Sequence, residues 1–363
     1  MNAFRSAHAH GATWRECVAG CAARLGKAGG GLGFVYFTDT LVPYAAPIVD
    51  TLREQTGVAD WIGTVGIGVI ATGTEYLDEP ALAVMVAEFA GENYSVFSGR
   101  KALKKGGEAR SGAHFAIVHA DPETPDVAGL IADMSSKVAS GYLVGGLSSS
   151  RARSVQVAND VISGGLSGAV FASSIKISTR LTQGCAPLPG RYRVTGCDQN
   201  VIATIDGRPA LEVMKRVIGE AFARDLRRAA QSIHVGLPVA GSDRGDYLVR
   251  NLVGIDPKNG LIAIGDLVEP GAELMFCKRD AQSARQDLER ILGELRAEAP
   301  AGARGALYYS CVGRGEHMFG ERGAELGLVK QALGELPLVG FFCNGEISHD
   351  RLYGYTGVLT LFH

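Results

Sequence analysis

The chain has 363 residues, of which 46% are hydrophobic, and its 36 basic and 38 acidic side chains leave a net charge of −2. This composition excludes a disordered chain and argues against a basic surface for nucleic acid. A chain of this length is too long to fold around one ordinary hydrophobic core, so we expect two domains.

Neither secretion nor membrane insertion is indicated. The first residues contain no apolar run behind a basic cap, as a signal peptide would, and no stretch reaches 18 consecutive apolar residues. The seven cysteines are scattered along the chain, which favours reduced thiols. We therefore expect a cytoplasmic protein that has no membrane partner.

The N-terminal segment, residues 1–27, predicts a strand and a helix packed on the first domain. Thr13 and Glu16 have the spacing of a capping box, and the helix that they open would end at Gly26.

A strand–helix–strand pattern followed by a further strand occurs three times. The copies comprise residues 33–39, 47–57, 61–70 and 81–89, then 113–121, 127–139, 142–150 and 168–175, and finally 305–311, 325–334, 337–347 and 357–363. Strand–helix–strand at this length predicts two parallel strands, and the added strand should return antiparallel. Gly63, Gly145 and Gly340 occupy a similar place in the three second strands. The pattern predicts a repeated unit with mixed sheets.

A Gly- and Pro-rich corner at 180–195 separates the second copy from the third. The sequence then predicts a strand at 201–207, a helix at 209–228, strands near 246–256, 260–268 and 273–280, and an amphipathic helix at 281–299. We expect a first domain at 28–206 with two copies and a second at 207–363 with one copy and the inserted strands. The predicted fold class is α/β (mixed α+β): two domains of repeated strand–helix–strand–strand units, with mixed sheets and helices packed outside.

The third copy carries the most chemistry. Its first strand runs into Cys311 and Arg314, and its second strand runs into Cys343, Asn344 and Glu346. Because parallel strands emerge at one edge, where ligands bind open α/β sheets, these side chains should meet there. They predict a site for a small anion, with a structural Arg314–Glu346 pair and buried thiols as the alternative.

Two features of the same segment refine this prediction. Gly315 follows Arg314 directly, so backbone N–H groups would lie beside a forked cation, which suits a carboxylate or phosphate. A nucleophilic Cys311 with His317 as its base is a second alternative, which would make the protein a thiol-dependent enzyme.

Four motifs then follow one another in a recognisable order. They are QGCAPLPGRYRVT, YLVRNLVGID with GDLV, SCVGRGEHMFG and LVGFFCNGEI. In this order the chain resembles the bacterial FIST sensory family over residues 28–363, with N- and C-terminal FIST regions. The resemblance implies a non-enzymatic intracellular sensor of small ligands such as amino acids. Family-typical positions are Cys185, Arg191, Arg250, Cys311, Arg314, Gly315, Asn344 and Glu346.

The resemblance also implies partners and an alternative cofactor. Some bacterial relatives are described as haem-binding nitric-oxide sensors that modulate a histidine kinase. Haem is therefore the alternative cofactor, with His317 and His234 as candidate ligands. No kinase, cyclase or DNA-binding segment is recognisable in the sequence, so we expect a separate signalling partner.

The leading hypothesis is a sensor that binds a small anionic metabolite beside Arg314, Asn344 and Glu346, with no cofactor required. If Arg314 proves structural, the ligand should bind in the N-terminal domain near Ser148 and Cys185.

Overall fold

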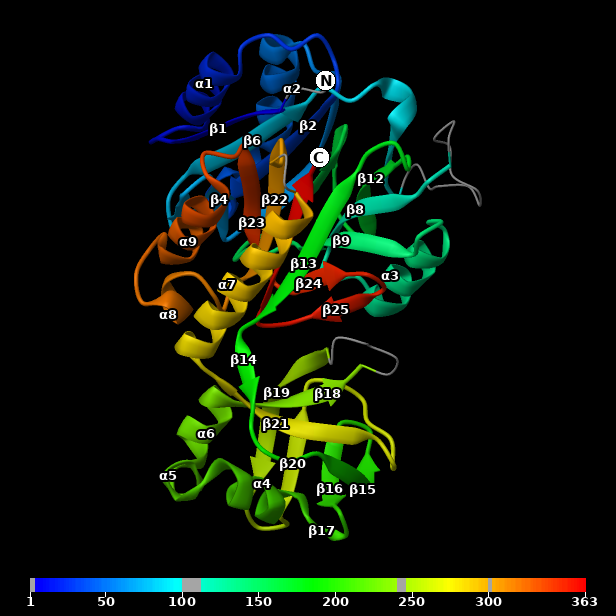
Figure 1. The fold of residues 1–363 in the computed structure, drawn as a ribbon, viewed down its shortest axis with the longest axis vertical. Helices are drawn as coiled ribbons and strands as arrows, with labels where there is room; N and C mark the ends of the chain where they lie inside the picture. Colours follow the sequence, from blue (N-terminus) through cyan, green and yellow to red (C-terminus); the bar gives the residue numbers. More distant parts are fainter. Residues whose placement is uncertain (1–3, 100–111, 240–245, 300–301) are drawn as a thin grey trace. The chain divides into compact units, whose positions relative to one another are not determined.

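The structure is a computed structural model that describes residues 4–99, 112–239, 246–299 and 302–363 (Figure 1). The chain divides into two compact units. We call residues 1–182 with 287–363 the repeat domain, and residues 183–286 the barrel domain. Helices and mixed sheets confirm the predicted fold class.

The described residues of the repeat domain form three six-stranded sheets. In order across each sheet, the first contains β1 (Phe4–His10), β6 (Ala81–Ala87), β2 (Leu32–Thr38), β3 (Asp60–Gly66), β10 (Gln156–Ala158) and β11 (Asp160–Ile162). The second contains β7 (Tyr94–Phe97), β12 (Leu166–Phe171), β8 (Phe115–Ala120), β9 (Tyr142–Leu147), β24 (Glu346–Ser348) and β25 (Arg351–Tyr353). The third contains β13 (Ile177–Gln183), β26 (Thr356–Phe362), β22 (Gly305–Cys311), β23 (Leu338–Cys343), β4 (Gly68–Ala71) and β5 (Thr74–Leu77).

Each sheet is built on one of the three predicted copies. The pairs β2–β3, β8–β9 and β22–β23 are parallel, and β6, β12 and β26 return antiparallel against the first strand of each pair. These pairings confirm the predicted repeat. The connecting helices are α2 (Ala45–Thr56) after a 3₁₀ turn (Asp39–Tyr44), α3 (Val127–Ser136) and α9 (Ala324–Leu333). A second 3₁₀ turn spans Gly91–Asn93.

Each parallel pair contains one glycine at an equivalent position, and this glycine allows the two strands to approach closely. A Cβ on Gly63, Gly145 or Gly340 would lie 1.7 Å from a backbone carbonyl oxygen of the neighbouring strand, that of Val35, Val118 or Tyr308 respectively. No side chain fits at that distance, so the close approach of the two strands requires glycine. The three glycines that align in the sequence are therefore equivalent in the structure.

The second strand of each copy is shorter than predicted, because it ends and the chain crosses to another sheet. After Gly66, β4 and β5 join the third sheet; after β9, β10 and β11 join the first; after Cys343, β24 and β25 join the second. The three repeats thus exchange hairpins in a cycle. The runs 61–70 and 337–347 concealed these breaks, because each contains two successive buried strands; in the run 142–150, β9 ends at Leu147 and β10 begins only at Gln156.

This exchange explains why the compact units differ from the expected domains 28–206 and 207–363. The third repeat takes its outer hairpin from the first repeat and gives one to the second, so its sheet belongs to the same unit as the other two. The barrel domain lies in the chain between the second and third copies, from the end of β13 to the first turns of α7 (Ala281–Glu298). Insertion between two chain-adjacent elements is tolerated when the inserted segment has its own core.

The N-terminal segment forms part of the first sheet. β1 pairs antiparallel with β6, and α1 (Trp14–Leu25) buries Cys17, Val18 and Cys21 against the sheet. Thr13 caps the helix by accepting a hydrogen bond from the backbone N–H of Glu16. Both cysteines are free thiols in the core.

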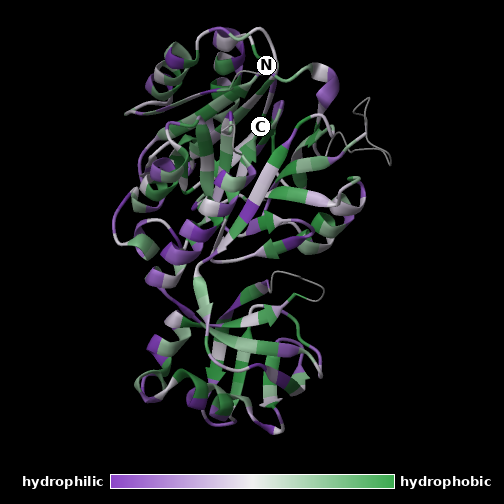
Figure 2. Ribbon diagram, viewed as in Figure 1, coloured by the Kyte–Doolittle hydropathy of each residue, from purple (hydrophilic) through white to green (hydrophobic). Residues whose placement is uncertain are grey.

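A single apolar core unites the three sheets, and Figure 2 shows many of their strands as hydrophobic. A small polar cluster lies within it. The hydroxyl of Tyr36 is 3.1 Å from Nε2 of His119 and 3.1 Å from the hydroxyl of Tyr309. These three residues are equivalent positions of the three repeats, each one residue beyond a glycine contact. Burial lowers the pKa of His119 to about 3, so the imidazole is neutral.

The barrel domain has a closed antiparallel barrel among its described residues. Its strands are β15 (Tyr192–Asp198), β16 (Val201–Ile205), β20 (Leu261–Ile264), β19 (Tyr247–Asp256), β18 (Ile233–Pro238) and β21 (Glu273–Arg279), and β21 pairs back to β15. β14 (Cys185–Pro187) and β17 (Arg208–Pro209) are short additions, and the helices are α4 (Ala210–Ile218), α5 (Glu220–Ala223) and α6 (Leu226–Ser232). The predicted single helix 209–228 is interrupted at Gly219, whose φ of 78° breaks the helical backbone.

Candidate functional site

The carboxyl ends of β22 and β23 lie side by side, as the parallel pairing predicts. Cys311 is in register with Cys343, and the N–H of Val312 donates to the carbonyl of Cys343 at 2.9 Å. Both thiols are buried. Burial, together with the neighbouring carboxylate of Glu346, raises the pKa of Cys311 to about 12. The thiol form therefore dominates at neutral pH, which gives the thiol-enzyme alternative no support.

Arg314 is buried, and its direct partner is Glu325 rather than Glu346. Its Nε donates to Oε1 of Glu325 at 2.8 Å, and its Nη2 is 2.6 Å from the same oxygen. Both side chains have no exposed area. Burial alone would lower the pKa of Arg314, but the charge of Glu325 outweighs it and the pKa lies above its ordinary value. In the alternative of a structural ion pair, the direct partner of Arg314 is therefore Glu325 and not Glu346.

Glu325 is saturated by donors from its surroundings. Besides Arg314, it accepts hydrogen bonds from the hydroxyls of Tyr308 at 2.6 Å and Ser310 at 3.1 Å, and from the N–H of Gly315 at 3.3 Å. Glu325 lies in the first turn of α9 on the buried face that also carries Val329. The sequence signal for Glu325 was its spacing four positions before the apolar Val329, which places both on one helical face, but this spacing alone did not single out Glu325 as a partner of Arg314.

The guanidinium of Arg314 is not saturated. Its Nη1 has no hydrogen-bond partner among the described residues, and the ring of Phe319 lies 5.3 Å from the guanidinium carbon. Phe319 belongs to α8 (Glu316–Phe319), a single turn. Gly315, Gly320 and Gly323 bracket this turn with φ of 56°, 90° and 78°. A short, glycine-bounded segment thus covers a buried cation that has donor capacity left.

Glu346 is buried close to the same cation. Its Oε2 accepts hydrogen bonds from the N–H and hydroxyl of Thr356, at 3.1 and 2.8 Å. Burial raises the pKa of Glu346 to about 8, although Thr356 and the charge of Arg314 oppose the rise. On the outer hairpin, burial likewise raises the pKa of Glu75 to about 7. Two carboxyl groups that titrate near neutrality therefore accompany the Arg314–Glu325 pair.

The other predicted residues of this edge have different surroundings. The side chain of Asn344 is exposed, while its N–H donates to the carbonyl of Leu147 at 3.1 Å. Ser148 is buried, with its hydroxyl 2.6 Å from that of Thr64. Ser148 thereby joins two repeats in the core. Asn344 faces solvent, unlike the buried Arg314 and Glu346.

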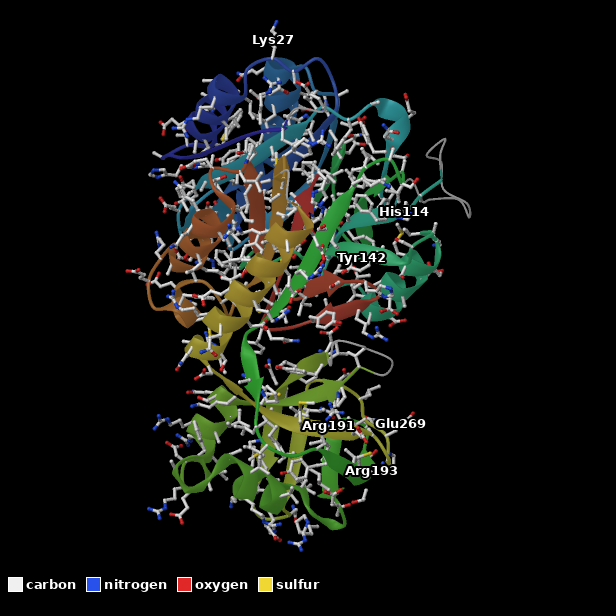
Figure 3. The ribbon with its side chains drawn as sticks, viewed as in Figure 1. Lys27, His114, Tyr142, Arg191, Arg193 and Glu269 are labelled. Carbon is white, nitrogen blue, oxygen red and sulfur yellow. The ribbon has the colours of Figure 1, made fainter. Side chains whose placement is uncertain are left out.

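Three family-typical residues, Cys185, Arg191 and Arg250, lie in the barrel domain instead, as does the haem candidate His234. Cys185 is buried, and its carbonyl accepts the hydroxyl of Tyr247 at 2.6 Å. Arg250 donates to Asp266 at 2.7 Å. Arg191 is exposed and lies 4.0 Å from Glu273 (Figure 3). The residues picked out by the resemblance thus belong to two compact units.

The two haem candidates differ in their exposure. His234, in β18, is 2% exposed, and burial and Arg279 lower its pKa to about 4. His317 is exposed on the single turn α8. An axial histidine must be reachable by the haem iron, so its burial counts against His234, whereas His317 is exposed. In the described part of the chain, His, Cys, Asp and Glu form no cluster of three or more suited to a metal ion.

None of the helices described here is both long and apolar enough to cross a membrane.

Comparisons with known proteins agree with the motifs. The sequence model of the FIST N domain matches residues 31–208, and that of the FIST C domain matches residues 210–349. FIST domains are associated with small-ligand-binding sensory functions in signal transduction. The two matches meet inside the barrel domain, so these family regions do not coincide with the compact units.

Mycobacterial proteins are similar over most of their length. Uncharacterized protein Rv0628c of Mycobacterium tuberculosis is 32% identical over 337 residues, which cover 88% of this chain and 87% of that protein. Uncharacterized protein Mb0898c of Mycobacterium bovis is 30% identical over 336 residues, which cover 88% and 86%. With both family regions matched in order, the chain belongs to the FIST family.

Proposed function

We propose that this protein is a cytoplasmic sensor that binds a small anionic or zwitterionic metabolite, such as an amino acid, at the buried Arg314. The observation that carries the proposal is the unused Nη1 of a guanidinium with no exposed area. An incompletely bonded buried cation is costly, so its retention favours a functional role.

The surroundings of Arg314 suit a ligand that carries both charges. Glu325 holds the guanidinium in place, which leaves Nη1 to donate to a ligand carboxylate. Glu346 lies close enough to influence the pKa of Arg314 and could accept an ammonium group. An amino acid needs one cation and one anion; Arg314 supplies the cation, and Glu346 would supply the anion by releasing its proton when the ammonium group binds.

Binding requires α8 to move. The turn holds Phe319 against Arg314, and the bracketing glycines can absorb the backbone change. A displaced α8 would present a new surface to a partner. We propose that the signal passes in this way to a separate protein, such as a histidine kinase.

A thermal-shift screen of the full chain against the twenty amino acids and simple carboxylates tests the proposal. A ligand at a hundred times its Kd should add about 2.7 kcal/mol to the free energy of unfolding. Arg314→Lys keeps the buried charge but loses the planar fork, so it should weaken binding while the protein stays folded. A ligand that stabilises both proteins equally would place the site elsewhere.

A further inference from the structure

A buried carboxyl group lies beneath α8, on the hairpin β4–β5 that the first repeat contributes to the third sheet. Glu75, in β5, is 3% exposed and pairs with Ile70 of β4. Ile70 belongs to the apolar cluster that includes Leu326 and Val329 of α9. Glu75 therefore places a carboxyl group in a largely apolar layer, where its ionised form is costly.

The α8 segment, residues 315–323, covers this carboxyl group with both of its ends. Oε1 of Glu75 lies 3.6 Å from the position of a Cβ on Gly315, and the N–H of Gly323 approaches the same carboxyl group. Neither oxygen of Glu75 makes a hydrogen bond of normal geometry with a described residue. A displacement of the α8 segment would therefore uncover Glu75 together with Arg314.

Charged groups lie on each element that covers the hairpin. They are Glu316 on α8, Arg322 in the connection to α9, and Glu325 and Lys330 on α9. Burial raises the pKa of Glu75 to about 7, and the carboxylates of Glu325 and Glu316 add to this rise. The N–H of Gly323 and the charge of Arg322 oppose it. When Glu75 ionises beneath the α8 segment, it thus adds a buried negative charge beside two other carboxylates.

The neighbouring cations do not remove this cost. Lys330 is paired with Glu335 at 2.7 Å. Arg322 donates hydrogen bonds to the side chain of Glu79 at 3.3 Å and to the carbonyl of Leu77 at 3.5 Å, which ties the α8 segment to the outside of the hairpin. With the Arg322 side chain 48% exposed, solvent screens this ion pair, so it adds little to the stability of the closed segment.

We propose that the α8 segment is a lid over Arg314, which Glu75 holds closed while it is protonated and releases when it ionises. The consequence for ligand binding rests on the function proposed above, whereas the movement of the lid does not. The pKa of Glu75 is about 7 under the closed lid and returns to its ordinary value of 4.5 when the lid opens. The closed lid therefore loses stability as pH rises through this interval and changes little above it.

Hydrogen exchange of the ligand-free full chain, followed by mass spectrometry of peptides that cover residues 315–323, measures the opening of the lid. After correction for the intrinsic exchange rate, opening of the wild type should increase between about pH 5 and about pH 7, by up to roughly tenfold per pH unit, and then level off. Glu75→Gln keeps the shape of the protonated side chain, so its lid should stay closed throughout this range.

Two control variants should keep the pH dependence. Glu79→Gln weakens only the outer ion pair with Arg322, so it should increase opening at every pH and leave the slope unchanged. His10 lies 3.0 Å from Glu79, and the same variant removes its contribution. Glu346→Gln removes the other buried carboxyl group with a raised pKa and should also leave the slope unchanged.

The proposal is overturned if opening of the wild type does not change with pH, if the change persists in Glu75→Gln, or if either control abolishes it. If Glu75→Gln does not fold, the uncharged variant Glu75→Met takes its place. Because no ligand is present, these outcomes are separate from the amino-acid screen. A screen without a hit would count against the function proposed at Arg314, whereas a lid that does not respond to pH would count against Glu75 alone.

Discussion

The first and third repeats share a backbone plan but place charge differently at the carboxyl edge. In the first repeat, Asp39 follows β2 and is bound by Arg151 at 2.8 Å, with the Arg151 side chain 52% exposed. In the third repeat, Arg314 follows β22 and is fully buried with Glu325. Water screens the guanidinium of the first pair, although Asp39 itself is buried, whereas both members of the second pair depend entirely on their protein partners. The same fold thus supports an ion pair with a solvent-exposed cation in one repeat and an ion pair with a fully buried cation in another.

Substitutions of the glycines that the three repeats share should cause the largest losses of stability. Gly63→Ala, Gly145→Ala and Gly340→Ala should each lower the free energy of unfolding by more than roughly 4 kcal/mol, because the new methyl overlaps a carbonyl oxygen. Urea denaturation measures this. Gly327→Ala, in an open position on α9, is the control and should be neutral or stabilising by up to about 1 kcal/mol. A mild effect at only one of the three glycines would break their equivalence.

The buried pair should be the next most sensitive. Arg314→Met removes the cation and leaves the carboxylate of Glu325 buried without its charge partner, which should cost roughly 3–5 kcal/mol. Adding Glu325→Leu should recover part of this loss, because the uncompensated charge disappears. Chemical denaturation of the single and double variants checks both. Equal stability of Arg314→Met and the wild type would contradict the buried-pair description.

The two repeats should also respond to pH with opposite signs. The pKa of Glu346 is raised to about 8 from 4.5, so between these values the folded protein holds a proton that the unfolded chain lacks. Its contribution to stability therefore falls as pH rises through this window, by at most about 1.4 kcal/mol per pH unit. Denaturation of the wild type and Glu346→Gln between about pH 5 and about pH 8, which lies within this window, should show that decline as a change in their stability difference.

Asp39 provides the contrast. Arg151 holds the pKa of Asp39 below its ordinary value of 3.8, although burial alone would raise it. Its stabilising contribution is present above that value and is lost as pH falls through the lowered pKa. A pH-independent difference for Glu346→Gln would remove the contrast between the two repeats.

The exposed pair should give the smallest effect. Arg151→Ala should cost roughly 1–3 kcal/mol, because solvent screens the half-exposed guanidinium but the buried Asp39 loses its side-chain hydrogen bonds to Arg151. The loss should shrink in high salt, which denaturation at two ionic strengths would detect. A loss as large as that of Arg314→Met would show that exposure does not separate the two pairs.

The strands and helices within each repeat could be predicted from the sequence, whereas the exchange of hairpins between the repeats could not. Apolar strands, intervening helices and the equivalent positions of Gly63, Gly145 and Gly340 follow from patterns within one copy. The hairpin exchange depends on which sheet receives a strand after Gly66 or Cys343, and both segments are apolar whichever sheet they join. The closed barrel likewise depends on β21 meeting β18 and β15, which no local pattern specifies.

At the site, the sequence identified the cation but not its environment. Arg314 stands out between two glycines at a strand end, yet a charged residue in such a loop is ordinarily exposed. Its burial follows from α8 and α9 packing over it, and Glu325 becomes its partner only through that packing. Sequence proximity to the second strand pointed to Glu346, which has Thr356 as its hydrogen-bond partner.

Binding of the ligand at the buried Arg314 is tested most directly by a matched pair of variants, each titrated with the strongest ligand from the amino-acid screen. Arg314→Lys and Arg151→Lys make the same chemical change, one at the buried cation and one at the exposed pair. Isothermal titration calorimetry should show affinity reduced roughly tenfold or more for Arg314→Lys, as loss of a charge-assisted contact predicts, and unchanged for Arg151→Lys. Equal affinities for Arg314→Lys and the wild type, with both proteins folded, would contradict the claim that the buried cation of the third repeat binds the ligand.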